Sequence, residues 1–121
     1  MTAEELRIGN KLDCGALHLP YGIGEVIEIC VDCLTMRVNG RIETYPFDGL
    51  KEIPLTEEWL LKARFERVGN DWFEIGDHFY PVGFNNDGEL IIMDWDNPVI
   101  KYVHQLQNLY FALTNQEIAF K

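Results

Sequence analysis

The first half of the chain combines short apolar stretches with alternation of apolar and polar positions. Residues 26–31 are mostly apolar, and residues 34–38 alternate with a period of two. These patterns are typical of β-strands, and Asn39-Gly40 directly after them is a strong hairpin signal. Further short extended stretches reach residue 53. Several short strands in so short a span predict a small SH3-like barrel or meander over residues 1–54.

The register of this hairpin follows from the same pattern. A two-residue loop would place Met36 opposite Glu43, which mixes apolar and polar side chains on one face. A three-residue loop that ends at Gly40 places Met36 opposite Ile42 and keeps the faces apart. Because a slip of one residue inverts every side chain of a strand, the pattern favours the three-residue loop, with Gly40 in a bulge.

Two helices are predicted in the second half of the chain. Thr56 is a preferred N-cap residue, and it begins a helix over about residues 56–64. Leu55 and Leu60 occupy the two positions of a hydrophobic staple, which fixes the angle of the incoming chain. Apolar residues at helical spacing predict a second helix over about residues 101–114.

Asn115 suits the left-handed position that commonly follows a helix. Between the two helices, turn-forming Gly, Asn and Asp residues separate four predicted strands, at residues 65–68, 72–75, 78–84 and 89–95.

Together these elements predict a β-rich α+β protein. We expect a single domain over residues 1–121, with an N-terminal SH3-like barrel or meander packed with a second β-sheet region and the two helices. Two lobes are possible: an SH3-like β lobe at residues 1–54, and a helix–sheet–helix lobe at residues 55–121. The length is typical of one domain with one core.

The charge of the chain narrows the class of partner. Twenty acidic and ten basic residues give a formal net charge of −10, and no cluster of five or more basic residues occurs. Binding of nucleic acid depends on Lys and Arg side chains that release condensed counterions from the phosphates. Non-specific binding of nucleic acid or of an anionic membrane is therefore disfavoured.

The sequence also bears on localisation. Residues 1–10 carry acids where a signal peptide carries bases, and they lack an apolar segment. No apolar run approaches the roughly 20 residues that span a bilayer. We expect a cytoplasmic protein whose three cysteines are reduced thiols.

The sharpest chemical pattern is a possible zinc site. Cys14 and His18 lie four residues apart, and Cys30 and Cys33 lie three apart, a ligand set that suits a tetrahedral zinc ion. Because Cys30 ends an apolar strand and Cys33 begins the next, core positions are the favoured interpretation. A redox role for this pair is weakened by the lack of a helix N-terminus that would stabilise a thiolate.

Other chemical patterns are weaker. The Gly22-Ile-Gly24 segment lacks the helix and the Lys-Ser/Thr pair of a phosphate-binding loop, so it predicts the entry to a strand. The acidic pairs at residues 87–89 and 94–96 predict solvated turns. His78 and His104 have no nucleophile nearby in sequence, and the absence of serine excludes a Ser-His-Asp hydrolase. The sequence therefore predicts no catalytic residue and no cofactor site.

Two longer motifs carry a family resemblance. Residues 53–62 (IPLTEEWLLK) and 100–114 (IKYVHQLQNLYFALT), with ELRIGN at 5–10, resemble small uncharacterised proteins of Bacteroidetes genomes, often found in prophages or mobile elements. The resemblance implies a phage-like accessory origin, with no assigned activity. Arg64 stands where the family pattern has glycine, which puts a non-glycine at a left-handed helix end. The cysteines are not a family feature, which lowers the expectation of zinc further.

These observations predict a non-enzymatic binding protein, a phage-associated accessory factor that engages a host or phage protein. A small-ligand binder, such as a protein that sequesters a nucleotide signal, would need basic residues such as Lys101, Arg37 and Arg41 to converge on a pocket. An enzyme would need polar groups with displaced pKa values in a cleft. The sequence leaves the partner and the oligomeric state open.

Overall fold

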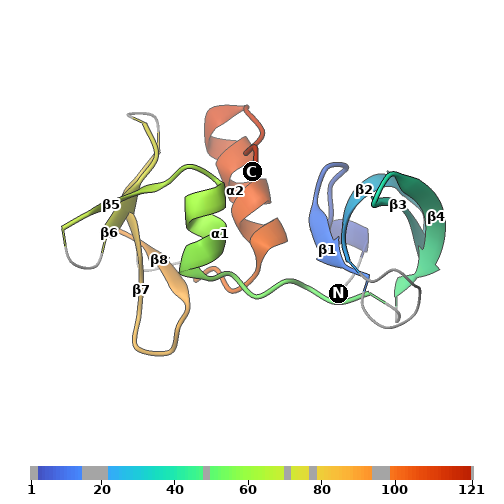
Figure 1. Cartoon of the computed structure of the whole chain (residues 1–121), viewed down its shortest axis with the longest axis horizontal. Helices are drawn as coiled ribbons and strands as arrows, with labels where there is room; N and C mark the ends of the chain where they lie inside the picture. The colour runs from blue at the N-terminus through green and yellow to red at the C-terminus, as the bar shows by residue number, and fades with distance from the viewer. Residues whose placement is uncertain are drawn as a thin grey trace. The chain divides into compact units, whose positions relative to one another are not determined.

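The computed structural model describes residues 3–14, 22–47, 50–69, 72–76, 79–93 and 99–120. It contains two four-stranded antiparallel sheets and two α-helices, which confirms a β-rich α+β protein (Figure 1). The chain divides into two compact units, Met1–Ile53 and Pro54–Lys121. Each unit is described by itself below.

The first unit contains one sheet in which every strand pairs with its neighbour along the chain, in the order β1-β2-β3-β4. A short 3-10 helix, η1, precedes it. Figure 1 shows that the sheet is strongly curved. The elements are η1 (Ala3–Glu5), β1 (Lys11–Asp13), β2 (Ile23–Ile29), β3 (Cys33–Val38) and β4 (Arg41–Pro46).

One face of this sheet forms the core of the first unit. The buried side chains alternate along the strands, as the period of two requires. They include Leu12, Cys14, Val26, Leu34, Met36, Val38 and Tyr45. Gly24 also lies on this face, where an added Cβ would stand 2.8 Å from Val38 Cγ2 and 2.9 Å from Cys14 Sγ. A glycine is therefore needed for β2 to approach the core this closely.

The β3–β4 hairpin has a two-residue loop, so the predicted three-residue loop is wrong. Val38 pairs with Arg41 and Met36 pairs with Glu43. Asn39 and Gly40 have φ values of 52° and 80°. Two successive left-handed residues make the type I′ turn, whose twist matches that of the flanking strands, and asparagine tolerates this conformation better than most residues.

The register is tolerated because β4 is the outermost strand of the sheet. Arg41 and Glu43 begin on the core side of β4, but at the edge their charged groups reach water. They form an ion pair with 3.3 Å between nitrogen and oxygen. The Tyr45 hydroxyl lies 3.4 Å from the other Glu43 oxygen. The charged and hydroxyl groups of Arg41, Glu43 and Tyr45 thus find polar partners at the edge of the sheet.

The chain that follows β4 returns to β1. Asp13 and Lys51 exchange two backbone hydrogen bonds, of 2.9 and 3.0 Å. This pair is a single bridge, and no closed barrel forms among the described residues. The first unit is therefore an open, curved antiparallel sheet.

The second unit contains the other sheet, in the order β5-β6-β7-β8, and both helices. Leu90 and Ile100 exchange two further backbone hydrogen bonds, of 2.8 and 2.9 Å, which extend the β8 edge. The elements are α1 (Glu57–Lys62), β5 (Glu66–Val68), β6 (Trp72–Glu74), β7 (Val82–Phe84), β8 (Leu90–Ile92) and α2 (Val103–Thr114). Both helices are therefore shorter than predicted.

The start of α1 differs from the prediction in one respect. Thr56 occupies the N-cap position, but its hydroxyl makes no capping hydrogen bond, so the predicted side-chain cap is wrong. The entry is held by the backbone instead: the Leu55 N–H donates to the Lys101 carbonyl at 2.9 Å, and Pro54 pairs with Tyr102. Leu55 and Leu60 are both buried, as the staple requires.

The end of α1 is a Schellman motif. The Phe65 N–H donates to the Leu60 carbonyl and the Arg64 N–H to the Leu61 carbonyl, both at 3.0 Å. Arg64 has a φ of 71°, so the prediction of a non-glycine in the left-handed position is confirmed. Leu60 and Phe65 are buried, as the apolar contact of this motif requires.

The α2 helix buries Val103, Leu106 and Tyr110 of the predicted apolar stripe, whereas Leu113 is 43% exposed. Gln107 is also buried. Asn115 has a φ of 60°, and its N–H donates to the Phe111 carbonyl at 2.7 Å, which confirms the predicted end. Within the described part of the chain, no helix is long and apolar enough to cross a membrane.

Candidate functional site

The three cysteines occupy two different places in the first unit. Cys14 is 2% exposed, with its sulfur 4.0 Å from Met36 Sδ and close to Gly24 at the start of β2. Burial, together with the negative charge of Asp13, raises the pKa of the Cys14 thiol from 9.0 to about 11. Cys14 is thus a core residue with a neutral thiol at neutral pH.

Cys30 and Cys33 flank the β2–β3 turn, and both are partly exposed. The Cys30 N–H donates to the Cys33 carbonyl at 3.0 Å. Partial desolvation and the Cys30 thiol, with a smaller effect of Asp32, raise the pKa of the Cys33 thiol. Both cysteines are only partly buried, whereas the sequence favoured core positions for them.

The structure does not bring Cys14 together with the other two cysteines. Cys14 lies beside Gly24, and Cys30 follows six residues later, which is about 20 Å along an extended strand. A zinc–sulfur bond is about 2.3 Å long. Among the described residues, no group of three His, Cys, Asp or Glu side chains could hold a metal ion. His18 lies outside the described residues.

The basic residues expected to line a ligand pocket do not converge on one. Arg37 pairs with Glu25 and Arg41 with Glu43, each at 3.3 Å. Residues 37 and 41 start from opposite faces of the first sheet, because Arg41 is opposite Val38, a core position. Lys101 belongs to the second unit and pairs with Glu89 at 3.3 Å.

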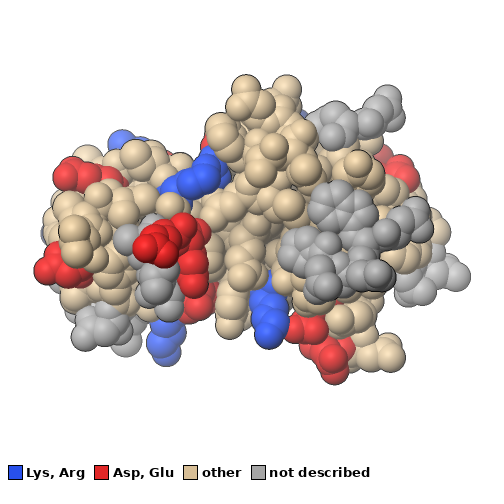
Figure 2. Space-filling model, turned by 180° about the vertical axis from the view of Figure 1, so that it is seen from behind, with Lys and Arg blue, Asp and Glu red and all other residues tan. Residues whose placement is uncertain are grey.

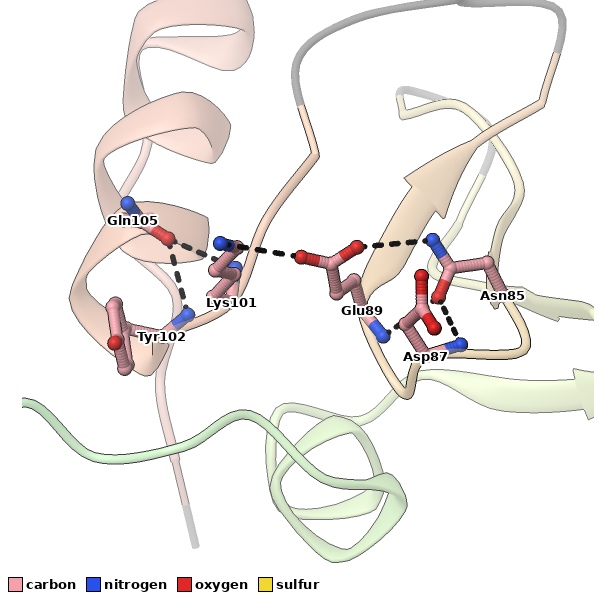
Figure 3. Close-up of polar contacts among 6 residues, drawn as sticks. All are labelled: Asn85, Asp87, Glu89, Lys101, Tyr102 and Gln105. Atoms are coloured by element: carbon pink, nitrogen blue, oxygen red, sulfur yellow. Dashed lines mark hydrogen bonds and ion pairs between the residues drawn. The ribbon is translucent and has the colours of Figure 1, made fainter.

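The acidic cluster around Glu89 is part of a turn network in the second unit. Figure 3 shows Glu89 between Asn85 and Lys101. Asn85 Oδ1 accepts the N–H groups of Asp87 and Glu89, at 2.9 and 3.0 Å, and Asn85 Nδ2 donates to Glu89 Oε1 at 3.3 Å. These contacts make the solvated turn that the sequence predicts, and the Lys101–Glu89 ion pair connects β7–β8 with the segment before α2.

The same network continues to the start of α2. Gln105 Oε1 accepts the N–H groups of Lys101 and Tyr102, at 2.9 and 3.1 Å (Figure 3). A glutamine three residues after the N-cap commonly binds back in this way. Its role is structural, because the hydrogen bonds satisfy backbone groups at a helix start.

The remaining candidates divide between described and undescribed residues. His104 is 1% exposed, and its ring stacks on that of Tyr102, with centroids 6.0 Å apart, so it is a buried residue of α2. Gly24 lies within β2, so the segment at residues 22–24 leads into a strand, as predicted. His78 and residues 94–96 lie outside the described residues.

One feature that the sequence did not reveal is the free edge of β4. In a two-residue hairpin the residues next to the loop form a hydrogen-bonded pair, and such pairs alternate along the ladder. Arg41, Glu43 and Tyr45 therefore direct their backbone groups to β3, while Ile42 and Thr44 direct theirs outward. No strand follows β4 in the sheet order of the described residues.

The side chains on this edge are open to solvent. Ile42 is 58% exposed and Thr44 is also exposed. Ile42 is opposite Arg37, and Thr44 is opposite Thr35 with the two hydroxyl oxygens 3.3 Å apart. At the far end, Pro46 removes one backbone donor, a common protection of an edge strand. Within the described part of the chain, no strand pairs with the outward backbone groups of Ile42 and Thr44.

The face beside this edge carries a ladder of charges across the strands. Glu25 lies between Lys11 and Arg37, with nitrogen–oxygen distances of 3.7 and 3.3 Å. Because Lys11, Glu25, Arg37 and Ile42 are successive partners across four strands, Ile42 is an apolar end to a polar row. On the face of the molecule in Figure 2, both basic and acidic side chains lie among uncharged residues.

In comparisons with known proteins, no protein-family model, no curated protein and no solved structure matches the chain.

Proposed function

We propose that this chain is a non-enzymatic binding protein whose β4 edge accepts an extended segment of a partner protein. The observation that carries the proposal is the outward direction of the backbone groups of Ile42 and Thr44 on an exposed outermost strand. A peptide that adds a strand to such an edge gains affinity from main-chain hydrogen bonds and specificity from alternate side chains.

The chemistry of the edge selects the kind of segment. Pro46 limits the pairing to residues 41–45, so the segment is short. Ile42 and Thr44 favour β-branched or aromatic partners as cross-strand neighbours. The net charge of −10 favours a basic segment, because opposite charge accelerates encounter and excludes acidic competitors. The proposed partner segment is therefore short, extended and net basic.

Other features of the chain also support a protein-binding function. The small-ligand alternative needs basic side chains that converge, and Arg37, Arg41 and Lys101 are each paired with a carboxylate. The proposal of a phage- or mobile-element-associated accessory role rests on the resemblance of residues 53–62 and 100–114. We also propose that the chain of the first unit follows an SH3-like course, which is supported by the bridge between Lys51 and Asp13 of β1.

The test uses a proline that blocks only the outward edge. Random eight-residue peptides are selected on the wild-type protein, and their affinities are compared for Thr44→Pro and Thr44→Val by calorimetry. Proline is tolerated where an edge N–H faces solvent, so the β3–β4 ladder remains. Thr44→Val keeps the N–H and the branched shape and serves as the matched control.

We expect selected peptides to be net basic, to bind Thr44→Val as they bind wild type, and to lose about tenfold or more in affinity for Thr44→Pro. The amide protons of Ile42 and Thr44 should become protected from exchange in the complex. Equal affinity for Thr44→Pro, or a selection without binders, contradicts the proposal.

A further inference from the structure

The ends of the β2–β3 turn place two thiols opposite each other. The pairing of Ile29 with Leu34 continues to Cys30 and Cys33, whose backbones are joined by the 3.0 Å hydrogen bond. Residues paired in this way in an antiparallel ladder have Cα atoms about 5.5 Å apart. This separation lies within the range of about 4.4–6.8 Å that a disulfide requires.

The side chains of Cys30 and Cys33, like their backbones, lie opposite each other across the turn. Opposite residues of an antiparallel pair point to one face, so the Cys30 and Cys33 side chains lie on the same side of the turn. The Cys30 sulfur also lies 3.9 Å from Glu28 Oε1. The turn is accessible: Val31 between the two cysteines is 94% exposed, whereas Cys14 is 2% exposed.

We propose that Cys30 and Cys33 form a reversible dithiol–disulfide pair that closes across the β2–β3 turn. The oxidant is a low-molecular-weight disulfide. One thiolate attacks it, forms a mixed disulfide and releases one small thiol. The second thiolate then attacks the protein sulfur of that mixed disulfide and releases the second small thiol. The protein loses two protons and two electrons, which together equal two hydrogen atoms, and the small disulfide takes them up to become two thiols.

The surroundings define which oxidants react. Glu28 and Asp32 place carboxylates beside the pair, and no basic side chain of the described residues is paired with either of them. A cationic disulfide such as cystamine is attracted to the turn, and the anionic glutathione disulfide is repelled. The pair is therefore a slow and charge-selective redox site, unlike the fast dithiol of an oxidoreductase, which has a helix N-terminus.

The experiment measures oxidation of the full chain by cystamine. The protein is treated under native conditions, its remaining thiols are alkylated, and it is cleaved after Glu28, which separates Cys14 from the other two cysteines. We expect a fragment with Cys30 and Cys33 that is lighter by two hydrogen atoms and unalkylated. Cys14→Ser should give the same fragment, and Cys33→Ser should stop at a mixed disulfide on Cys30.

A second measurement tests the contribution of the fold. The equilibrium constant for disulfide formation against cystamine is measured in the native protein and in concentrated urea. Because the turn holds the thiols together, we expect the native constant to exceed the unfolded one by about tenfold, or about 30 mV for this two-electron couple. Equal constants, or adducts on both cysteines without ring closure, overturn the proposal.

Discussion

Among single residues, Arg64 shows the clearest disagreement between residue type and backbone conformation. Its φ of 71° lies in the left-handed region, where a side chain costs about 1–2 kcal/mol. The Schellman motif that ends α1 requires this conformation, because the hydrogen bonds from Arg64 and Phe65 depend on it. The chain thus tolerates strain at this position to end the helix with Phe65 in the core.

Arg64→Gly should therefore stabilise the protein. Glycine adopts the left-handed conformation without a steric cost, although it gives more entropy to the unfolded chain, so the expected net gain is about 1 kcal/mol. Urea unfolding followed by circular dichroism measures it. Arg64→Ala, which removes the same charge but keeps the strain, is the control and should give no gain. An equal gain in both variants would mean that removal of the charge, and not relief of backbone strain, stabilises the protein.

Cys14 connects a single thiol to the pH dependence of stability. Its folded-state pKa of about 11 lies above the ordinary value of 9.0. The unfolded state therefore loses its proton first as pH rises, and stability that is complete below pH 9 is lost progressively toward pH 11. The expected loss is about 3 kcal/mol.

Unfolding by urea at a series of alkaline pH values checks this expectation in wild type and in Cys14→Ala. The alanine variant is less stable at neutral pH because it leaves a cavity, but its curve should fall less steeply over the same interval. Parallel curves for the two proteins would mean that Cys14 does not titrate during unfolding. Tyr45 and Tyr110, whose pKa values are also raised by burial from 10.0, begin to lower stability above about pH 10 in both proteins, so the comparison of the two curves rests on the interval from pH 9 to 10.

At the scale of elements, the junction before α1 depends on the backbone and on Leu55. Thr56 makes no side-chain cap, while Leu55 is buried and its N–H is bonded to Lys101. Leu55→Ala should cost about 2–4 kcal/mol, as a large-to-small change in a core does. Thr56→Ala should cost at most a few tenths of a kcal/mol. Chemical denaturation of both variants measures the loss in the free energy of unfolding. A loss of about 1 kcal/mol or more for Thr56→Ala would mean that the Thr56 hydroxyl caps the helix after all.

The elements also show which features local sequence can predict. The helices, the left-handed conformation at Asn115 and the existence of the β3–β4 hairpin follow from neighbouring residues, because caps, turns and periodicity are local. The left-handed conformation at Arg64 was expected from the family resemblance. The register of that hairpin does not follow. The argument from alternation required apolar residues on one face of β4, but an edge strand can direct Arg41 and Glu43 to water.

This error of register also hid the candidate binding edge. In β4, the residues whose backbone groups face outward change with a shift of one position, so Ile42 and Thr44 could not be identified before the pairing was known. The distance of Cys14 from Cys30 likewise depends on the path of β2. In contrast, the closeness of Cys30 and Cys33 was accessible from their spacing across a short turn.

At the scale of the whole molecule, charge governs the choice of partner. With a net charge of −10, the protein should not bind random-sequence single-stranded or duplex DNA with a Kd near or below about 1 µM at about 150 mM salt. Fluorescence anisotropy with labelled oligonucleotides provides the measurement, and the same buffer with a short basic peptide gives the comparison. Micromolar binding of DNA would require a basic surface formed by folding.

The order of strands in the two sheets has a consequence for the speed of folding. In both sheets each strand pairs with its neighbour along the chain, so most of the pairing can proceed as hairpins with little loop-closure entropy to overcome. Asp13 with Lys51, and Pro54 with Tyr102, join segments that are far apart in sequence. We expect these two bridges to form after the rate-limiting step, so that weakening them accelerates unfolding and leaves the folding rate nearly unchanged.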